Sequence, residues 1–408
     1  MDRPLSDVVV LDLTRALAGP IASRLLADLG AEVIKIEPPD GDLTRAMSPR
    51  VGGISAYYVH YNAGKQCLSM DLTNAEGRDL FLRLVERADV VLENYRPDVM
   101  GRLGLGYDVL STRNPRIILA SISGWGHGNS RSLQGAYASA IHAEAGITEM
   151  VARRRGESDA PRNDPMSHSD TYGGLHALAA LLAALHMRNR TGVGQAVEVS
   201  MAESTLMVND LSTPELTGED PTSGFRAGQN WSGIYRLRTG RFVNLTIDAT
   251  TDGGFGVFVT ATGHHEWRED PRFTTAELRN ANRAALQEAV GQWVANFDTA
   301  AEVESAIGVS TVLAAEVRTV PELAATAWAS ERGAFVPIDV GRGEEVVVPQ
   351  SPWRFSDADS GVQPIVGYRG EHNRDILQRM LGLDDAEVDR LEADGVVSDR
   401  VPGWRREG

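Results

Sequence analysis

The chain has 408 residues and a formal net charge of −16, because 56 acidic side chains outnumber 40 basic ones. This balance excludes nucleic acid as a bulk partner, since phosphate binding is driven mainly by clustered Lys and Arg. Lys35 and Lys65 are the only lysines, and all other residues of the Lys and Arg class are Arg. A coding bias toward Arg accounts for this scarcity, although the two cations are not physically interchangeable.

The composition is that of an ordinary globular protein. With 42% hydrophobic residues, the chain can bury a full core and divide into two domains of about 100 to 200 residues. Cys67 is the only cysteine, which excludes an internal disulfide and fits a reducing compartment. The first residues lack a signal-peptide pattern, and the most apolar helical run, 175–185, is shorter than the ~20 residues that span a bilayer. We therefore expect a cytoplasmic protein without membrane contact.

The first half of the chain alternates short β-branched runs with helical patterns. Strands are predicted over 8–13, 32–37, 89–93, 116–123 and 197–201, and helices over 21–29, 81–88 and 173–190. This alternation is typical of βαβ units around a parallel sheet, whose crossovers are right-handed. Thr191-Gly192-Val193-Gly194 follows the longest helix and is a good stop signal. The first half therefore predicts an α/β fold.

The composition changes after Leu211. The stretch 212–229 is rich in Ser, Thr, Pro, Gly and acidic residues, which indicates a linker. The later predicted elements are a strand over 242–247, helices over 281–297, 300–307 and 321–330, a hairpin of 335–340 with 345–348 about Gly341-Arg342-Gly343, and a helical tail from 371. The region after the linker therefore predicts a smaller α+β domain.

Several common catalytic patterns are missing. The turn Arg15–Pro20 lacks the G-x-G-x-x-G pattern, which disfavours NAD, although the helix that follows can present free N–H groups to an anion. Ser121–Gly126 does not match the G-x-S-x-G nucleophile elbow, so a serine hydrolase is disfavoured. His264-His265-Glu266 has no partner at metal-ligand spacing, and we expect no metal site. Cys67 is interpreted as a small buried residue rather than a nucleophile.

The segment Met166–Gly174, which leads into the long helix, is the most informative part of the sequence. Asp170 stands just before the predicted helix, where an aspartate is usually an N-cap. A second role is compatible with capping, because free N–H groups and the helix dipole keep the carboxylate ionised and able to act as a nucleophile. Gly173 and Gly174 leave room for another group to approach. Position alone does not separate the two roles.

A series of short motifs covers nearly the whole chain. They are 17–20, 26–37, 41–45, 62–65, 89–97, 102–104, 114–116, Asp170, 184–185, Arg188, 191–195, 370–372 and 395–397. Each fragment is weak alone, but in this order and spacing they resemble the family III CoA-transferases, the CaiB/BaiF family. That family includes formyl-CoA:oxalate and carnitine CoA-transferases and is related to α-methylacyl-CoA racemases.

The resemblance implies a fold and an assembly. It implies a large Rossmann-like domain with a parallel sheet formed by residues 1–205 and 335–408, a linker over 206–229 and a small α+β domain over 230–334. It also implies a homodimer whose two subunits interlock. The implied partners are an acyl-CoA thioester and a carboxylic acid, so coenzyme A enters as a substrate and no permanently bound cofactor is expected.

The resemblance also implies a mechanism. An aspartate ahead of the long helix attacks the acyl-CoA thioester in this family, and Asp170 matches it. The implied enzyme moves CoA between an acyl-CoA and a free carboxylic acid through an aspartyl-acyl anhydride and an aspartyl-CoA thioester on Asp170. The implied CoA-binding residues are Ala16, Leu17, Ala18, Met70, Asn94, Tyr95, Arg96 and Arg102. Gly228 and Gln229 match the end of a loop that shields the intermediate from water.

The chain departs from its relatives at the expected acyl pocket, where Tyr137 and His142 are the candidate residues. The racemases carry the histidine of an acid/base pair where this chain has Ala136-Tyr137-Ala138, and a tyrosine is a poor base at neutral pH. His142 is the candidate substitute, so a racemase-like epimerase is one alternative. A CoA-binding protein without catalytic turnover is another.

The two lysines both fall inside the matched motifs. Lys35 lies at the end of the second predicted strand, and Lys65 lies in the turn Asn62–Lys65. Both are near the face expected to bind CoA, where a compact, strongly hydrated ammonium group suits an acidic protein that binds an anion. The sequence leaves open whether either lysine contacts CoA or only braces a loop.

Overall fold

The computed structural model describes residues 2–155, 157, 160–218, 231–249, 251–308 and 313–406. The chain divides into two compact units, and each is described by itself. The larger unit contains Met1–Ser212 and Trp328–Gly408, and the smaller contains Thr213–Ala327. Among the helices of the described residues, none is both long enough and apolar enough to cross a membrane.

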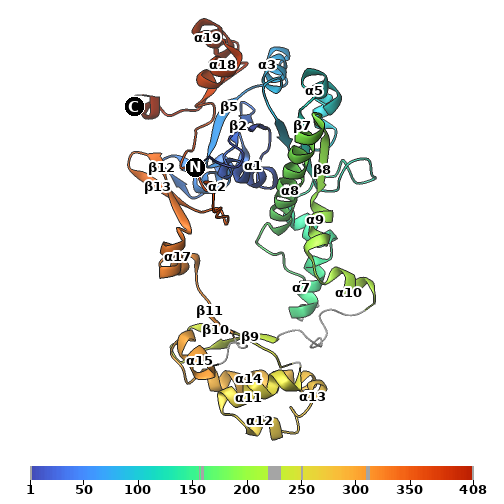
Figure 1. The fold of residues 1–408 in the computed structure, drawn as a ribbon, viewed down its shortest axis with the longest axis vertical. Helices are drawn as coiled ribbons and strands as arrows, with labels where there is room; N and C mark the ends of the chain where they lie inside the picture. The colour runs from blue at the N-terminus through green and yellow to red at the C-terminus, as the bar shows by residue number, and fades with distance from the viewer. Residues whose placement is uncertain are drawn as a thin grey trace. The chain divides into compact units, whose positions relative to one another are not determined.

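Six parallel strands form the central sheet of the larger unit (Figure 1). They are β1 (Val9–Asp12), β2 (Glu32–Glu37), β5 (Lys65–Ser69), β6 (Val90–Glu93), β7 (Ile118–Ser123) and β8 (Ala196–Ser200). Their order is β5-β2-β1-β6-β7-β8, so the chain builds one side of the sheet from β1 and then the other from β6. The order reverses between β1 and β6, which is where open α/β sheets bind their ligands.

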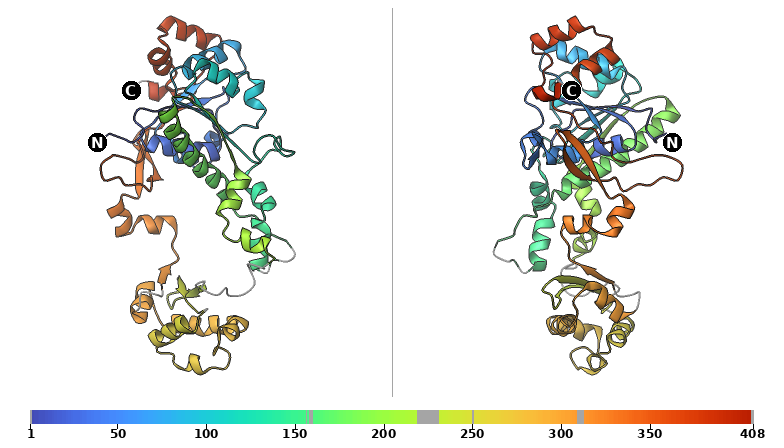
Figure 2. Two further views of the ribbon diagram at one scale, coloured as in Figure 1. Left: turned by 45° about the vertical axis from the view of Figure 1, so that its right-hand side comes forward. Right: turned by 90° about the vertical axis from the view of Figure 1, so that its left-hand side faces the viewer.

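Helices cover both faces of this sheet, because successive side chains of a strand point to opposite faces. On one face, α1 (Ala18–Asp28) and α8 (His168–Thr191) share a core with strand residues such as Val10 and Leu92. The opposite core contains Leu11 and Val91 and the helices α3 (Ala75–Val85), α5 (Tyr107–Arg113), α18 (Asn373–Leu381) and α19 (Asp385–Ala393). Figures 1 and 2 show α18 and α19 beside α3. The C-terminal segment therefore completes the larger unit.

The predicted hairpin is confirmed. Strand β12 (Phe335–Gly341) pairs with β13 (Glu344–Pro349) in antiparallel fashion, and its core includes Tyr58 and Val59 of α2 (Ala56–Asn62). The remaining elements of this unit are η1 (Leu43–Ala46), β3 (Arg50–Val51), β4 (Ile54–Ser55), α4 (Val99–Arg102), α6 (Ala138–Glu144), α7 (Ile147–Arg155), α9 (Met201–Val208), α17 (Ala327–Arg332), which begins at the unit boundary, and α20 (Gly403–Arg406).

The smaller unit packs helices on a three-stranded antiparallel sheet with the order β11-β10-β9. Its elements are α10 (Ser212–Leu216), which begins at the boundary, β9 (Trp231–Arg236), β10 (Phe242–Ile247), α11 (Asp252–Thr262), α12 (Glu266–Glu269), α13 (Ala276–Ala281), α14 (Arg283–Val294), α15 (Ala300–Ile307), β11 (Leu313–Glu316) and α16 (Val320–Ala324). Phe258, Val290 and Val303, from three of the helices, share one core with Leu245 of the sheet. An α+β arrangement results.

One local prediction was wrong. Lys65 was placed in a turn, but it begins the buried strand β5, where its charge is neutralised inside the protein. The stretch 212–229, interpreted as a linker, begins with the short helix α10, and residues 219–229 lie outside the described residues. Pro214 is compatible with this helix because it stands in the first turn, where its missing N–H costs no intrahelical hydrogen bond.

Candidate active site

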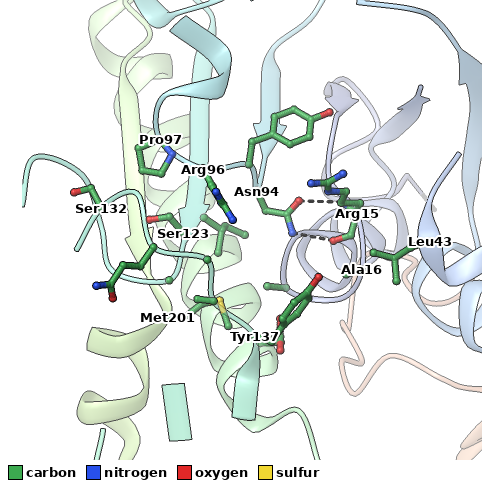
Figure 3. A pocket seen from close by; sticks show the side chains of 18 residues that line it. Arg15, Ala16, Leu43, Asn94, Arg96, Pro97, Ser123, Ser132, Tyr137 and Met201 are labelled. Carbon is green, nitrogen blue, oxygen red and sulfur yellow. Dashed lines mark hydrogen bonds between the residues drawn. The ribbon is translucent and has the colours of Figure 1, made fainter. Parts of the chain in front are cut away.

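A pocket opens at the point where the sheet order reverses, beyond the ends of β1 and β6. Its wall comes from the segments that follow these strands, from the start of α8 and from the loop before α6. The lining residues are Arg15, Ala16, Ala18, Leu43, Asn94, Tyr95, Arg96, Pro97, Ile122, Ser123, Gly124, Ser132, Gln134, Gly135, Ala136, Tyr137, Asp170 and Met201 (Figure 3). The sequence predictions for Ala16, Ala18, Asn94, Tyr95, Arg96, Tyr137 and Asp170 thus converge on one cavity.

Asp170 supplies the carboxylate of this pocket, and its expected N-cap position was wrong. Helix α8 begins at His168, so Asp170 lies inside the first turn, and Ser167 occupies the N-cap position without a capping hydrogen bond from its side chain. Burial raises the pKa of Asp170 to about 6, against hydrogen bonds from the backbone amides of Ala138 and Ala18 that favour the ionised form. The carboxylate is therefore mostly ionised at pH 7, and the amides of Ala18 and Ala138 favour its charge while it does not cap its own helix.

Close packing of two helices brings the Ala18 amide to Asp170. Gly174 lies one turn after Asp170 on α8, and a Cβ atom built there would stand 2.5 Å from the carbonyl oxygen of Ala18 and 2.1 Å from Ile21 Cγ2. Only glycine permits this approach. The room that the sequence predicted at Gly174 is therefore filled by the first turn of α1, and the packing places a helix N-terminus beside the carboxylate.

The turn after β1 lines the pocket and is fastened by hydrogen bonds to Asn94. Ala16 has φ of 65°, a left-handed conformation that is costly for a residue with a Cβ atom. Asn94 at the end of β6 fastens the preceding residue: Arg15 N–H donates to Asn94 Oδ1 at 2.9 Å, and Asn94 Nδ2 donates to Arg15 O at 2.8 Å (Figure 3). Of the predicted pair Asn94 and Tyr95, Asn94 therefore bonds to the protein itself and shapes the turn that lines the pocket.

Two cationic side chains lie along the pocket. Arg96 approaches the loop before α6, where a Cβ on Gly135 would stand 3.1 Å from its guanidinium. The Arg15 guanidinium lies 5.6 Å from the centre of the Tyr95 ring. The Tyr137 side chain is 69% exposed at the pocket edge. The guanidinium groups of Arg15 and Arg96 give an acidic protein a local site for an anion.

Four candidates do not line this pocket. Leu17 and Met70 are buried in the protein. Arg102 is exposed and pairs with Asp98 at 2.8 Å on its own helix. His142 is 2% exposed, and its Nε2 accepts a hydrogen bond at 3.2 Å from Ser169 N–H. His142 therefore holds the first turn of α8 instead of facing a substrate. The candidates Gly228 and Gln229 lie outside the described residues.

Sequence reasoning missed two tyrosines near the carboxylate. Burial raises the pKa of Tyr57 to about 12 and also raises that of Tyr61, and the charge of Asp170 adds to both shifts. Their rings lie 5.1 Å apart on α2, one helical turn from each other. The spacing of Tyr57 and Tyr61 is visible in the sequence, but an aromatic pair at this spacing is also typical of a core-facing helix.

The two lysines do not reach the pocket surface. Lys35 and Lys65 are both 0% exposed, and neither is among the described lining residues. Of the two roles that the sequence left open, the structure supports bracing, because each ammonium group is enclosed by protein oxygen atoms.

Fold and pocket define an α/β protein with a carboxylate at the ligand-binding edge of its parallel sheet. The sequence model of CoA-transferase family III matches residues 5–373. The chain therefore belongs to this family of enzymes, as the motifs predicted.

Individual relatives support the same assignment. The succinyl-CoA–D-citramalate CoA-transferase of Chloroflexus aurantiacus is 33% identical over 97% of this chain and 98% of its own. The acetyl-CoA:oxalate CoA-transferase of Acetobacter aceti is 36% identical over 70% of this chain and 74% of its own. The crystal structure of a CAIB/BAIF family protein from Brucella suis is 31% identical, covers 93% of this chain and 100% of its own, and superposes with a TM-score of 0.79. The chain thus resembles CoA-transferases along nearly its full length.

Proposed function

We propose that this enzyme transfers CoA from an acyl-CoA thioester to a free carboxylic acid through covalent intermediates on Asp170. The observation that carries the proposal is a half-buried, ionisable carboxylate in the pocket at the sheet's switch point, with the backbone amides of Ala18 and Ala138 beside it. A carboxylate that is mostly ionised at pH 7 can attack a thioester without a separate base. No feature of the described site favours epimerisation, because His142 bonds to the backbone of α8.

The proposed transfer takes four steps. An oxygen of Asp170 bonds to the thioester carbonyl carbon, the C–S bond breaks, and CoA thiolate leaves a mixed anhydride. The thiolate then attacks the Asp170 carbonyl carbon, which releases the donor acid and leaves an aspartyl-CoA thioester. The acceptor carboxylate attacks this thioester and forms a second anhydride. Thiolate attack on the acceptor's acyl carbon finally gives the new acyl-CoA and restores Asp170.

The two amides beside Asp170 fit this chemistry. Each attack on the Asp170 carbonyl carbon puts negative charge on an oxygen that lies next to the N–H groups of Ala18 and Ala138. Fixed donors of this kind stabilise an oxyanion without reorganising. The half-buried position of the carboxylate also limits the access of water to an anhydride that water would hydrolyse. We infer that both amides act in the transition states.

We assign CoA to the wall formed by Ala16, Asn94, Tyr95 and Arg96, where the cations and the N-terminus of α1 can meet its phosphates. The relatives' names contain the acids D-citramalate and oxalate. We therefore propose a small polar carboxylic acid as the acceptor, to be sought with panels of acyl-CoA thioesters and carboxylates. The proposal further includes an interlocked cytoplasmic homodimer and no permanently bound cofactor.

Trapping of the covalent intermediate tests the proposal. The enzyme is incubated with an acyl-CoA without acceptor acid, quenched with hydroxylamine or borohydride, and digested for mass spectrometry. We expect the peptide that contains Asp170 to carry the mass change, because both intermediates are acyl derivatives of this carboxylate. An inactive CoA-binding protein would give unmodified peptide. Steady transfer activity with no modified Asp170 would sink the mechanism.

The pH dependence of kcat/KM for acyl-CoA gives a second prediction. The reactive form is the carboxylate, and burial raises the pKa of Asp170 to about 6. We therefore expect kcat/KM to be high at pH 7 to 8 and to fall about tenfold per pH unit below about pH 6, since kcat/KM reports groups of the free enzyme. An acid limb centred near pH 4 would mean that Asp170 is not desolvated in the working enzyme.

A further inference from the structure

The chain's only two lysines are both fully buried, which is rare for this residue type. Lys65 Nζ lies 3.0 Å from Asp12 Oδ2, and Lys35 Nζ lies 3.0 Å from Asp42 Oδ2. Both carboxylates are also buried. We call these four residues, Asp12, Lys35, Asp42 and Lys65, the buried quartet. Two positive and two negative charges make it neutral overall, so it can persist in the interior only with its partners in place.

One half of the quartet holds the backbone of the turn after β1. Lys35 Nζ donates to Thr14 O at 2.7 Å. Thr14 N–H donates to Asp12 Oδ1 at 2.9 Å, and Ala16 N–H donates to Asp42 Oδ1 at 3.4 Å. Side chains of the quartet thus bind the amide and the carbonyl of Thr14 and the amide of Ala16. Peptide groups inside a protein need such hydrogen-bond partners.

The other half holds the start of α1. Lys65 Nζ donates to Pro20 O at 3.1 Å and to Ser23 Oγ at 2.8 Å. Ser23 Oγ in turn donates to Asp12 Oδ2 at 2.7 Å. Ala18 packs against α8 at Gly174, and its amide lies beside the Asp170 carboxylate. This amide lies between two anchored segments, Thr14–Ala16 before it and Pro20–Ser23 after it.

We propose that Lys35 and Lys65 are positioning residues of the catalytic site. They hold the Thr14–Ala18 turn in the conformation that aims the Ala18 amide at Asp170 and presents the pocket wall to acyl-CoA. The inference rests on the proposed function of Asp170. A turn with a left-handed alanine does not keep this shape by its own preference. Two ammonium groups are suited to the task because each offers three donors to oxygen atoms in different directions.

The charge state of both lysines agrees with this role. Burial lowers the pKa of Lys65 to about 8, although Asp12 acts in the opposite direction. Burial also acts to lower the pKa of Lys35, but Asp42 and Asp12 outweigh it and the pKa is raised. Both side chains are therefore protonated at pH 7 and keep all their donor hydrogens.

The test compares Lys65→Met and Lys35→Met with a matched variant, Arg188→Met. Arg188 is also buried and ion-paired, with Asp89 at 2.7 Å, but it lies at the opposite end of α8 from Asp170. For each full-length enzyme, kcat and KM are measured per folded molecule, and hydrogen exchange is followed in the peptide that covers Thr14–Ala18. A merely structural lysine would lower the folded fraction without changing kcat of the folded enzyme.

We expect both lysine variants to lose at least about tenfold in kcat, since a small misplacement of a catalytic group is costly, and to exchange amides of the turn faster. Arg188→Met should keep kcat within about twofold. Equal kcat values for the three variants would overturn the inference. If the lysine variants do not fold, Ser23→Ala removes one link between Lys65 and Asp12 without leaving a charge unpaired. Its expected kcat loss is about threefold, and an unchanged kcat and exchange rate would also overturn the inference.

The outcome is separable from that of the proposed function. Trapping at Asp170 in the unaltered enzyme decides the mechanism by itself. A trapped Asp170 together with fully active lysine variants would remove only the positioning role. A missing intermediate would remove the basis of both proposals.

Discussion

Replacing Asp170 by Asn should lower kcat for CoA transfer at least about 10³-fold, the order of loss found when a catalytic nucleophile is removed. The amide side chain is nearly the same size, so the packing of α8 on α1 is retained, but it cannot attack a thioester. The measurement is the rate of new acyl-CoA formation with a donor thioester and an acceptor acid. Asp79→Asn is the matched control, because Asp79 is exposed on α3 and should leave kcat unchanged.

The same variant should change how stability depends on pH. The pKa of Asp170 is raised in the folded state, so the folded protein binds its proton more tightly than the unfolded chain. The stabilisation is fully present below the unfolded pKa near 4 and is lost as pH rises through about 6. From pH 4 to pH 7, the free energy of unfolding of Asp170→Asn should therefore gain about 1–3 kcal/mol relative to the unaltered enzyme. An equal pH dependence of the two proteins would contradict the partly desolvated position of Asp170.

Local patterns in the sequence were sufficient to predict those elements whose own residue types favour the observed structure. The strand predicted over 32–37 has the bounds of β2, because its β-branched residues Val33, Ile34 and Ile36 favour an extended strand. The long helix ends as predicted at Gly192, whose φ of 77° needs a residue without Cβ. The strand β5 was missed because it begins with Lys65, a residue that belongs in a buried strand only when Asp12 lies beside it. That pairing is set by the fold and not by neighbours in sequence.

The site residues also divide into those that sequence motifs indicate and those that only the fold brings together. Asp170 could be selected from its motif, and Asn94 and Arg96 from theirs. The amides of Ala18 and Ala138 could not, because every non-proline residue has an N–H group and only the packing of α1 and α6 around α8 aims these two at the carboxylate. Arg102 and Met70 were selected only by resemblance. In this chain Arg102 forms an ion pair on the surface, and Met70 lies in the hydrophobic core.

Gly174→Ala should disrupt that packing and so separate the Ala18 amide from Asp170. The new Cβ would meet the backbone oxygen of Ala18 at 2.5 Å, and a backbone atom yields only if the whole helix moves. We expect a net loss of about 1–3 kcal/mol of stability, since overpacking outweighs the higher helix propensity of alanine. We also expect kcat to fall about 10²-fold through the loss of one fixed donor. Thermal unfolding and steady-state kinetics measure the two effects.

The adjacent glycine provides the control, because it occupies the same helix with a different neighbour. A Cβ on Gly173 would meet Met201 Cγ at 3.1 Å, and a methionine side chain can change rotamer. Gly173→Ala should therefore keep stability within about 1 kcal/mol, with the propensity gain in its favour, and keep kcat within a few-fold. If both substitutions impair the enzyme equally, added bulk anywhere on this turn is harmful and the contact of Gly174 with α1 has no special role. If only Gly174→Ala does, the close approach of α1 to α8 positions the donor for Asp170.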